Sequence, residues 1–277
     1  MQDHQCTSCG EERKETETVI QETDLLYFKN WFDDYVKQFR TGDERIDPAI
    51  GLKEKHTRRV AVEIIDIGCS LHLDTEYCRL AEIVALLHDI GRFKQYVRYR
   101  TYSDQKSEDH AKLGLEEIAR TGVLDRLPLY EQELVGNVVS YHNRASLPPS
   151  DDHKFLLLLK LLRDADKVDI LHVVTEHYAG YGRNEAINIG LPDTPEISEK
   201  IVGSILSGRL ADVNDMRTVN DFKLLQVGWV FDINFPRTYQ IFKQRRYLEK
   251  LSAALPQTGT VLQAIESARS FLLRNAN

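Results

Sequence analysis

Residues 81–93 read AEIVALLHDIGRF, an apolar helical segment that ends in a histidine, an aspartate and a glycine. The spacing of its apolar residues predicts a helix over residues 75–90, which Gly91 would end because glycine readily adopts the left-handed conformation found after many helices. His88 and Asp89 then lie at the tip of a buried helix. Since burying a polar or charged group without a partner is costly, both side chains must meet partners from elsewhere in the chain.

The preceding helix supplies one such partner. A helix is expected over residues 48–70, and the short turn 71–74 makes it an antiparallel neighbour of the helix that follows. His56 lies 14 residues before the turn and His88 lies 13 residues after it, so that both are about 20 Å from the turn at about 1.5 Å per residue. We therefore expect His56 to reach the same depth as His88 and Asp89.

The rest of the chain is helical in pattern, with no convincing strand series and no internal repeat, and the predicted fold class is all-α. Further helices are expected over residues 24–39, 107–120, 128–142, 151–178, 195–207, 219–231, 236–252 and 258–274. A basic, tyrosine-bearing loop is expected over residues 92–106. We divide the chain into a mobile tail (1–22), a helical domain (23–180) and a C-terminal helical extension packed on that domain (181–277).

Composition narrows the class of protein. The 277 residues are 42% hydrophobic and carry a net charge of −7, which is typical of a globular protein and argues against a broad nucleic-acid surface. No apolar run is long enough for a membrane span or a signal peptide, so we expect a cytoplasmic protein. Cys6 and Cys9 form a CxxC beside His4, but a zinc site normally needs a second ligand pair and none follows.

Further polar residues lie on apolar helical segments. Asp164, Asp166 and Asp169 share one segment, and periodicity does not choose among them as a buried ligand. His110 is expected in the first turn of a helix, where the helix dipole favours the neutral, metal-binding imidazole. His142 ends a helix as His88 does. One turn beyond Asp166, Asp169 is a candidate for orienting a ligand histidine.

The order His…His-Asp…His…His…Asp resembles the defining motif of the HD-domain superfamily of metal-dependent phosphohydrolases. The strings LLHDIGRF, DHAKLG, YHN and DADKVD follow the family's order and approximate spacing over about residues 50–180. The resemblance implies a helical bundle of the HD-domain type with a central metal site, and it selects Asp166 as the last ligand. One ion would have four ligands, and a second would share Asp89. The implied ligands are His56, His88, Asp89, His110, His142 and Asp166.

The chemistry implied is phosphate-ester hydrolysis. One or two divalent ions would lower the pKa of a bound water, and the resulting hydroxide would attack phosphorus. Nitrogen and oxygen ligands suit manganese, iron, nickel, cobalt or magnesium without ranking them. The basic loop would bind the substrate phosphate through Arg92, Lys94, Arg98 and Arg100. Asp89, Arg92 and Lys94 are the expected catalytic residues.

A nucleotide or a related phosphorylated small molecule is the favoured substrate, and two alternatives remain. The chain could be a non-catalytic nucleotide-binding regulatory module, although no ligand of the motif is missing. It could also be a phosphodiesterase of a cyclic or linear dinucleotide. The members of the family that cleave cyclic dinucleotides usually carry a lysine after HDIG and a GYP motif, whereas this chain has Arg92 and no GYP.

Overall fold

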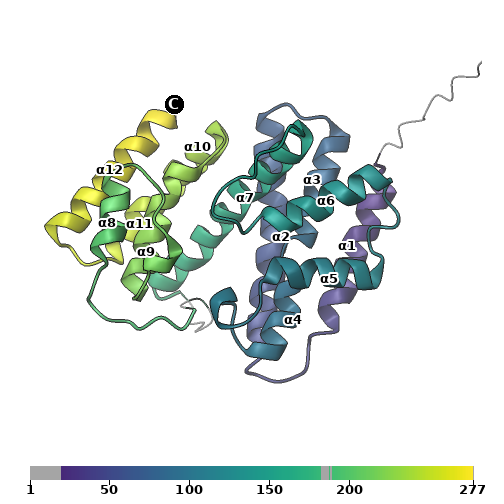
Figure 1. Cartoon of the computed structure of the whole chain (residues 1–277), viewed down its shortest axis with the longest axis horizontal. Helices are drawn as coiled ribbons and strands as arrows, with labels where there is room; N and C mark the ends of the chain where they lie inside the picture. Colours follow the sequence, from purple (N-terminus) through teal and green to yellow (C-terminus); the bar gives the residue numbers. More distant parts are fainter. Residues whose placement is uncertain (1–19, 182–186, 188, 277) are drawn as a thin grey trace, which may run out of the picture.

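The computed structural model describes residues 20–181, 187 and 189–276, and these residues contain helices and no strand (Figure 1). The predicted all-α class is confirmed. Cys6, Cys9 and His4 lie outside the described residues. The helices form an N-terminal group, a long central helix and a C-terminal group. The N-terminal group consists of α1 (Glu22–Lys37), α2 (Asp47–Ser70), α3 (Thr75–Leu87), α4 (Ile90–Tyr99), the short 3-10 helix η1 (Asp104–Lys106), α5 (His110–Thr121) and α6 (Leu129–Tyr141).

The central helix, α7 (His153–Tyr178), contacts both groups and separates them in Figure 1. On one side it packs against α2, α3 and α6, and on the other against α10 and α11. The C-terminal group consists of α8 (Glu199–Leu206), the 3-10 helix η3 (Val213–Asp215), α9 (Val219–Gly228), the 3-10 helix η4 (Trp229–Asp232), α10 (Pro236–Gln244), α11 (Tyr247–Ala253) and α12 (Gly259–Asn275). A single cluster of buried apolar side chains runs through all three parts.

The expected loop over residues 92–106 is wrong in its first half, because Gly91 does not stop the chain from continuing as a helix. Helix α4 begins at Ile90, directly after the site residues His88 and Asp89. Gly91 is needed here for space: a Cβ atom on it would lie 2.1 Å from the carbonyl oxygen of His110 and 2.5 Å from the amide nitrogen of Gly114. The glycine therefore allows α4 and α5 to pack backbone to backbone.

The single helix expected over residues 236–252 is also wrong. The chain forms α10 and α11, and Arg246 between them adopts a left-handed conformation with φ of 55°. Arg245 beside this break forms an ion pair with Glu63 of α2 at 2.7 Å. The bend thus directs a cation of the C-terminal group onto the N-terminal group.

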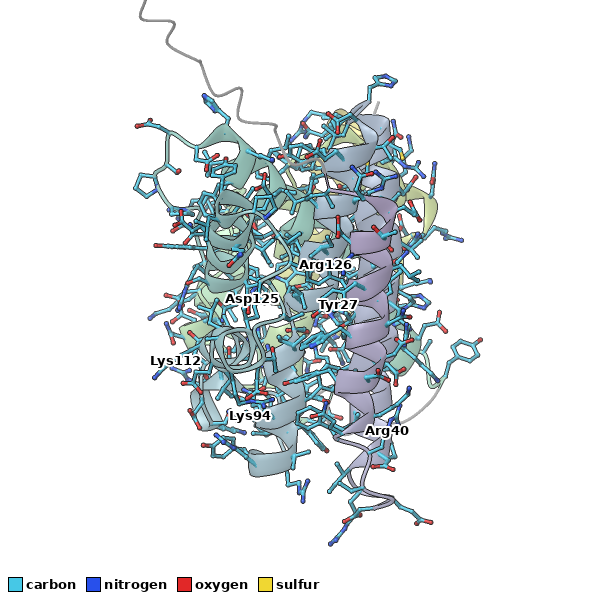
Figure 2. The ribbon with its side chains drawn as sticks, turned by 90° about the vertical axis from the view of Figure 1, so that its right-hand side faces the viewer. Tyr27, Arg40, Lys94, Lys112, Asp125 and Arg126 are labelled. Carbon is cyan, nitrogen blue, oxygen red and sulfur yellow. The ribbon has the colours of Figure 1, made fainter. Side chains whose placement is uncertain are left out.

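Contacts of α1 hold it against the other helices of the N-terminal group. Arg126, in the connection between α5 and α6, bonds to Asp24 at 2.6 Å and lies over the ring of Tyr27 at 5.2 Å (Figure 2).

Within the described parts of the chain, every helix is too short or too polar to cross a lipid bilayer.

Candidate metal centre

The antiparallel pair α2 and α3 brings His56 and His88 together as the count of residues from the turn predicts. Their ring centroids lie 5.6 Å apart, and both side chains are buried. Pro48 in the first turn of α2 supports the start of that helix, and Asp74 caps the start of α3 by accepting a hydrogen bond from the amide of Tyr77. Regular helices around a short turn therefore set the register of this histidine pair.

His110 and His142 complete the group of histidines. His110 is the first residue of α5, whose N-cap Asp109 accepts from the amide of Ala111, and His142 follows the last turn of α6. The Nε2 atoms of His110 and His142 lie 2.9 Å apart, and the rings of His88 and His142 are 5.3 Å apart. Four helices thus direct four imidazoles to one buried point.

Asp89 lies between two pairs of histidines. Its Oδ2 atom is 3.4 Å from Nε2 of His56 and 3.5 Å from Nε2 of His88. Its Oδ1 atom is 3.4 Å from Nε2 of His110 and 3.9 Å from Nε2 of His142. Two groups of ligand atoms therefore share this carboxylate, and within each group the atoms lie within 4.8 Å of one another. A carboxylate shared in this way is suited to bridging two cations.

The three aspartates of α7 have three different surroundings. Asp166 places Oδ1 3.1 Å from Nε2 of His56 and so faces the centre. Asp169 contacts the opposite edge of the same ring, with Oδ2 2.7 Å from Nδ1 of His56, and it also pairs with Arg59. Asp164 points away and accepts hydrogen bonds from the backbone amides of Asn234 and Phe235 at 3.0 and 3.1 Å.

Each Nδ1 atom of the four histidines has an acceptor outside the centre. His88 and His142 donate to the carbonyl oxygens of Ala85 and Val139, each at 2.7 Å. His56 and His110 face the carboxylates of Asp169 and Asp104. A proton held on Nδ1 leaves the lone pair of Nε2 directed inward, as metal-ligating histidines require.

Buried atoms without a hydrogen bond lie at the same point. Among the described residues, these include Nε2 of His56, Nε2 of His88 and Oδ1 of Asp166. Such atoms are costly unless another group satisfies them. Their nitrogen and oxygen chemistry fits a divalent cation of the first transition row or magnesium.

The protonation states of three of the four histidines and of Asp89 favour cation binding. Burial lowers the pKa of His88. Burial and the charge of Arg92 lower the pKa of His110 to about 4. Burial and the neighbouring His88 lower the pKa of His142 to about 4. Burial and Lys53 also lower the pKa of His56, but its carboxylate neighbours outweigh them and raise it to about 10. Burial opposes ionisation of Asp89, yet nearby Lys53 and His88 hold its pKa well below the usual range. The centre thus joins three neutral imidazoles, those of His88, His110 and His142, to ionised carboxylates, while His56 carries a proton that a bound cation would displace.

The basic side chains expected to bind phosphate are placed unequally. Arg92 faces the centre, with Nε 3.5 Å from Oδ1 of Asp89. Lys94 instead pairs with Glu117 at 2.9 Å, on the face of the bundle that Figure 2 shows. Arg98 is half exposed, and its nearest ion pair is with a glutamate of the η1–α5 connection at 3.8 Å. Arg100 is exposed at the end of α4.

Sequence reasoning missed Lys53. Its Nζ atom donates to Oδ2 of Asp89 at 2.6 Å, and its side chain is only 16% exposed. Lys53 lies three residues before His56 on α2, so that the helical period places both on one face. That spacing was the available signal.

Asp104 was also missed. It joins Nδ1 of His110, at 2.6 Å, to the guanidinium of Arg92, at 2.7 Å. Although burial opposes ionisation, the hydrogen bond to His110 and the charge of Arg92 lower the pKa of Asp104. It follows the histidine-aspartate pair at no regular helical spacing, and nothing in the sequence marked it.

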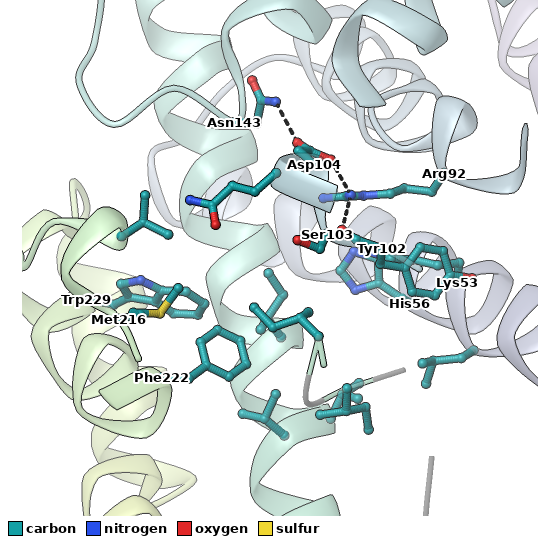
Figure 3. A pocket seen from close by; sticks show the side chains of 18 residues that line it. Lys53, His56, Arg92, Tyr102, Ser103, Asp104, Asn143, Met216, Phe222 and Trp229 are labelled. Carbon is teal, nitrogen blue, oxygen red and sulfur yellow. Dashed lines mark hydrogen bonds and ion pairs between the residues drawn. The ribbon is translucent and has the colours of Figure 1, made fainter. Parts of the chain in front are cut away.

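A cavity of about 400 Å³ opens onto this centre and extends to the C-terminal group. Figure 3 shows Lys53, His56 and Arg92 on one side of it and Met216, Phe222 and Trp229 on the other. Its lining residues are Leu52, Lys53, His56, Arg92, Tyr102, Ser103, Asp104, Gln105, Asn143, Ile170, Val173, Val174, Ile187, Ile189, Val213, Met216, Phe222 and Trp229. The cavity has the size typical of a small-molecule site.

We expect Asp169→Asn to weaken metal binding by about 10- to 100-fold, because a neutral amide orients the His56 ring less firmly and lowers its basicity. The affinity is measured by competition with a chromogenic chelator. Asp66→Asn is the matched control, since Asp66 also pairs with an arginine, Arg237, at 2.8 Å, but lies outside the centre. Equal affinities of the two variants would contradict a positioning role for Asp169.

Comparison with known families agrees with this geometry. The family model described as HD domain matches residues 54–171, a span from α2 to α7 that includes all six residues around the centre. No curated protein and no solved structure gave a significant match. HD domains are all-helical and are typical of a superfamily of metal-dependent phosphohydrolases. Residues 54–171 of this chain, with the histidines and aspartates that they bring together, are an HD domain.

Proposed function

We propose that the protein is a metal-dependent phosphohydrolase that acts on a phosphorylated small molecule. The observation that carries this proposal is the sharing of Asp89 between two pairs of inward-facing histidine nitrogens, at the end of a cavity that also presents Lys53 and Arg92. His56, His88, Asp89 and Asp166 would hold one divalent ion. Asp89, His110 and His142 would hold a second.

Divalent ions at these positions would lower the pKa of water and polarise a phosphoryl oxygen. The side chains around them have separate tasks. Lys53 and Arg92 offer positive charge to the phosphate from two directions, and Arg92 is held in place through its Nη1 by the carbonyl of Tyr102 at 2.6 Å and by Asp104. Among the described residues, Nε of Arg92 has no hydrogen-bond partner and can donate to substrate.

The basic side chains that face the cavity differ from those expected from the sequence. The phosphate-binding set that we propose is Lys53 and Arg92, whereas Lys94, Arg98 and Arg100 do not line the cavity. Lys94 contributes instead to the packing of α4 on α5 through Glu117.

The proposal is tested on purified chain that has been stripped with a chelator and reloaded separately with manganese, iron, nickel, cobalt or magnesium. We expect metal-dependent release of phosphate or alcohol from a panel of phosphomonoesters, phosphodiesters and nucleotides. Arg92→Met should lower kcat/KM by about a hundredfold, since one donor to a developing negative charge is lost. Arg98→Met, on the same helix but outside the cavity, should leave kcat/KM unchanged.

Failure of every metal to support turnover on the whole panel would refute the proposal. Tight metal and nucleotide binding without turnover would indicate the regulatory module instead. Activity confined to dinucleotides would indicate the phosphodiesterase.

A further inference from the structure

We infer that the substrate is a phosphate ester of an apolar alcohol, whose hydrocarbon part lies between α7 and the C-terminal helices. This inference rests on the proposed function, because it takes the metal centre as the place of the phosphate. It assigns the C-terminal group of helices a part in substrate selection.

Among the described residues, the charged side chains that line the cavity lie at one end of it (Figure 3). Lys53, His56 and Arg92 line it beside the metal centre, together with Asp104 and Asn143. The positive charges of Lys53 and Arg92 suit a phosphate, while the Asp104 carboxylate holds the Arg92 guanidinium in place. A phosphate bound there directs its alcohol part toward the remaining space.

At the other end, the described side chains that line the cavity are mainly apolar. Helix α7 presents Ile170, Val173 and Val174, and the C-terminal group presents Phe222 and Trp229, with Met216 beside them (Figure 3). Phe222 and Trp229 are only partly buried although they pack against the core. Both side chains line the cavity.

This lining favours an alkyl group over a nucleobase. A base buried in such a site would lose the hydrogen bonds that its ring nitrogens and exocyclic groups make with water, and this loss is costly. The Nε2 atom of Gln105, which also lines the cavity, donates to Oδ1 of Asn214 at 3.4 Å and is not free for a base. A hydrocarbon chain loses no hydrogen bonds and gains free energy from leaving water.

The test uses a series of n-alkyl phosphates from ethyl to octyl, each below its micellar concentration, with the metal that supports turnover. The leaving groups have nearly equal basicity, so differences in kcat/KM report binding of the chain. One fully buried methylene is worth about fourfold, and with incomplete burial we expect at least about a thirtyfold rise from ethyl to octyl phosphate. The rise should appear mainly in KM, and nucleoside monophosphates should be poorer substrates than octyl phosphate.

Two variants locate the effect. Phe222→Ala should lower kcat/KM for octyl phosphate more than for ethyl phosphate and so remove most of the preference for the longer chain. Phe231→Ala is the matched control, because Phe231 is a half-buried aromatic that packs on Phe271 with ring centroids 5.0 Å apart and does not line the cavity. If Phe222→Ala does not fold, Val213→Asp replaces it, since Val213 lines the cavity and is 46% exposed.

The outcomes separate the two proposals. Turnover with equal kcat/KM for ethyl and octyl phosphate, or a preference for nucleotides, overturns this inference and leaves the phosphohydrolase intact. If no ester is hydrolysed, the proposed function fails, and titration with octylphosphonate against ethylphosphonate by calorimetry decides whether the apolar end binds a chain. Equal affinities in that titration overturn the inference as well.

Discussion

Replacing His56 and His88 together by alanine is expected to abolish metal binding and to lower the proposed phosphohydrolase activity by at least about a thousandfold, because a metal would supply several kcal/mol of stabilisation to the transition state. The two rings lie 5.6 Å apart, and both Nε2 atoms face the Asp89 carboxylate. Neither nitrogen has another hydrogen-bond partner among the described residues. Elemental analysis gives the metal content per chain, and circular dichroism shows that the helices remain.

His153→Ala serves as the control, because His153 is exposed in the first turn of α7, several turns before Asp166. Its metal content and activity should equal those of the unmodified chain. A double variant that keeps its helices and its full content of ion would contradict the assignment of the whole centre.

Gly91→Ala is expected to destabilise the fold by at least about 3 kcal/mol, the upper range for a group forced into a packed interior. The added Cβ atom would lie 2.1 Å from the His110 carbonyl oxygen and 2.5 Å from the Gly114 amide nitrogen. Both are backbone atoms, so no side chain can turn aside to make room. Helices α4 and α5 must separate, and urea denaturation followed by circular dichroism measures the loss.

Gly203→Ala is the matched substitution at a helical glycine with free space. Nothing lies within 4 Å of the Cβ atom that it would add on α8, and alanine favours helix over glycine by about 1 kcal/mol. The free energy of unfolding of this variant should equal or exceed that of the unmodified chain. A Gly91→Ala variant as stable as the Gly203→Ala variant would show that α4 and α5 do not need this close approach.

The expected position of His56 could be obtained from the sequence because it depends on local regularity. Two helices of fixed rise joined by a short turn leave little freedom, so the distance of each histidine from the turn sets its depth. The choice among Asp164, Asp166 and Asp169 could not be made in this way. It depends on partners such as Asn234, which lies 70 residues away in sequence.

The place of Lys94 outside the cavity could not be read from the sequence for a related reason. A cluster of basic residues indicates positive charge near the motif, but only the helix α4 decides which side chains face inward. Arg92 and Lys94 are two residues apart, and on a helix such a separation places side chains on different faces. The same rule, applied to Lys53 and His56, would have found the lysine that lines the cavity.

Two carboxylates on one turn of α7 connect the C-terminal helices to the candidate metal centre. Asp164 holds the backbone of Asn234 and Phe235, while Asp166 faces His56. An insertion near residue 234 would therefore displace the turn of α7 that carries Asp166. Ending the chain after α7 would leave the buried Asp164 without its amide donors, at a cost of about 1–3 kcal/mol or more for an unsatisfied charged group. A shortened chain intended to keep the metal centre should therefore retain the helices that follow α7.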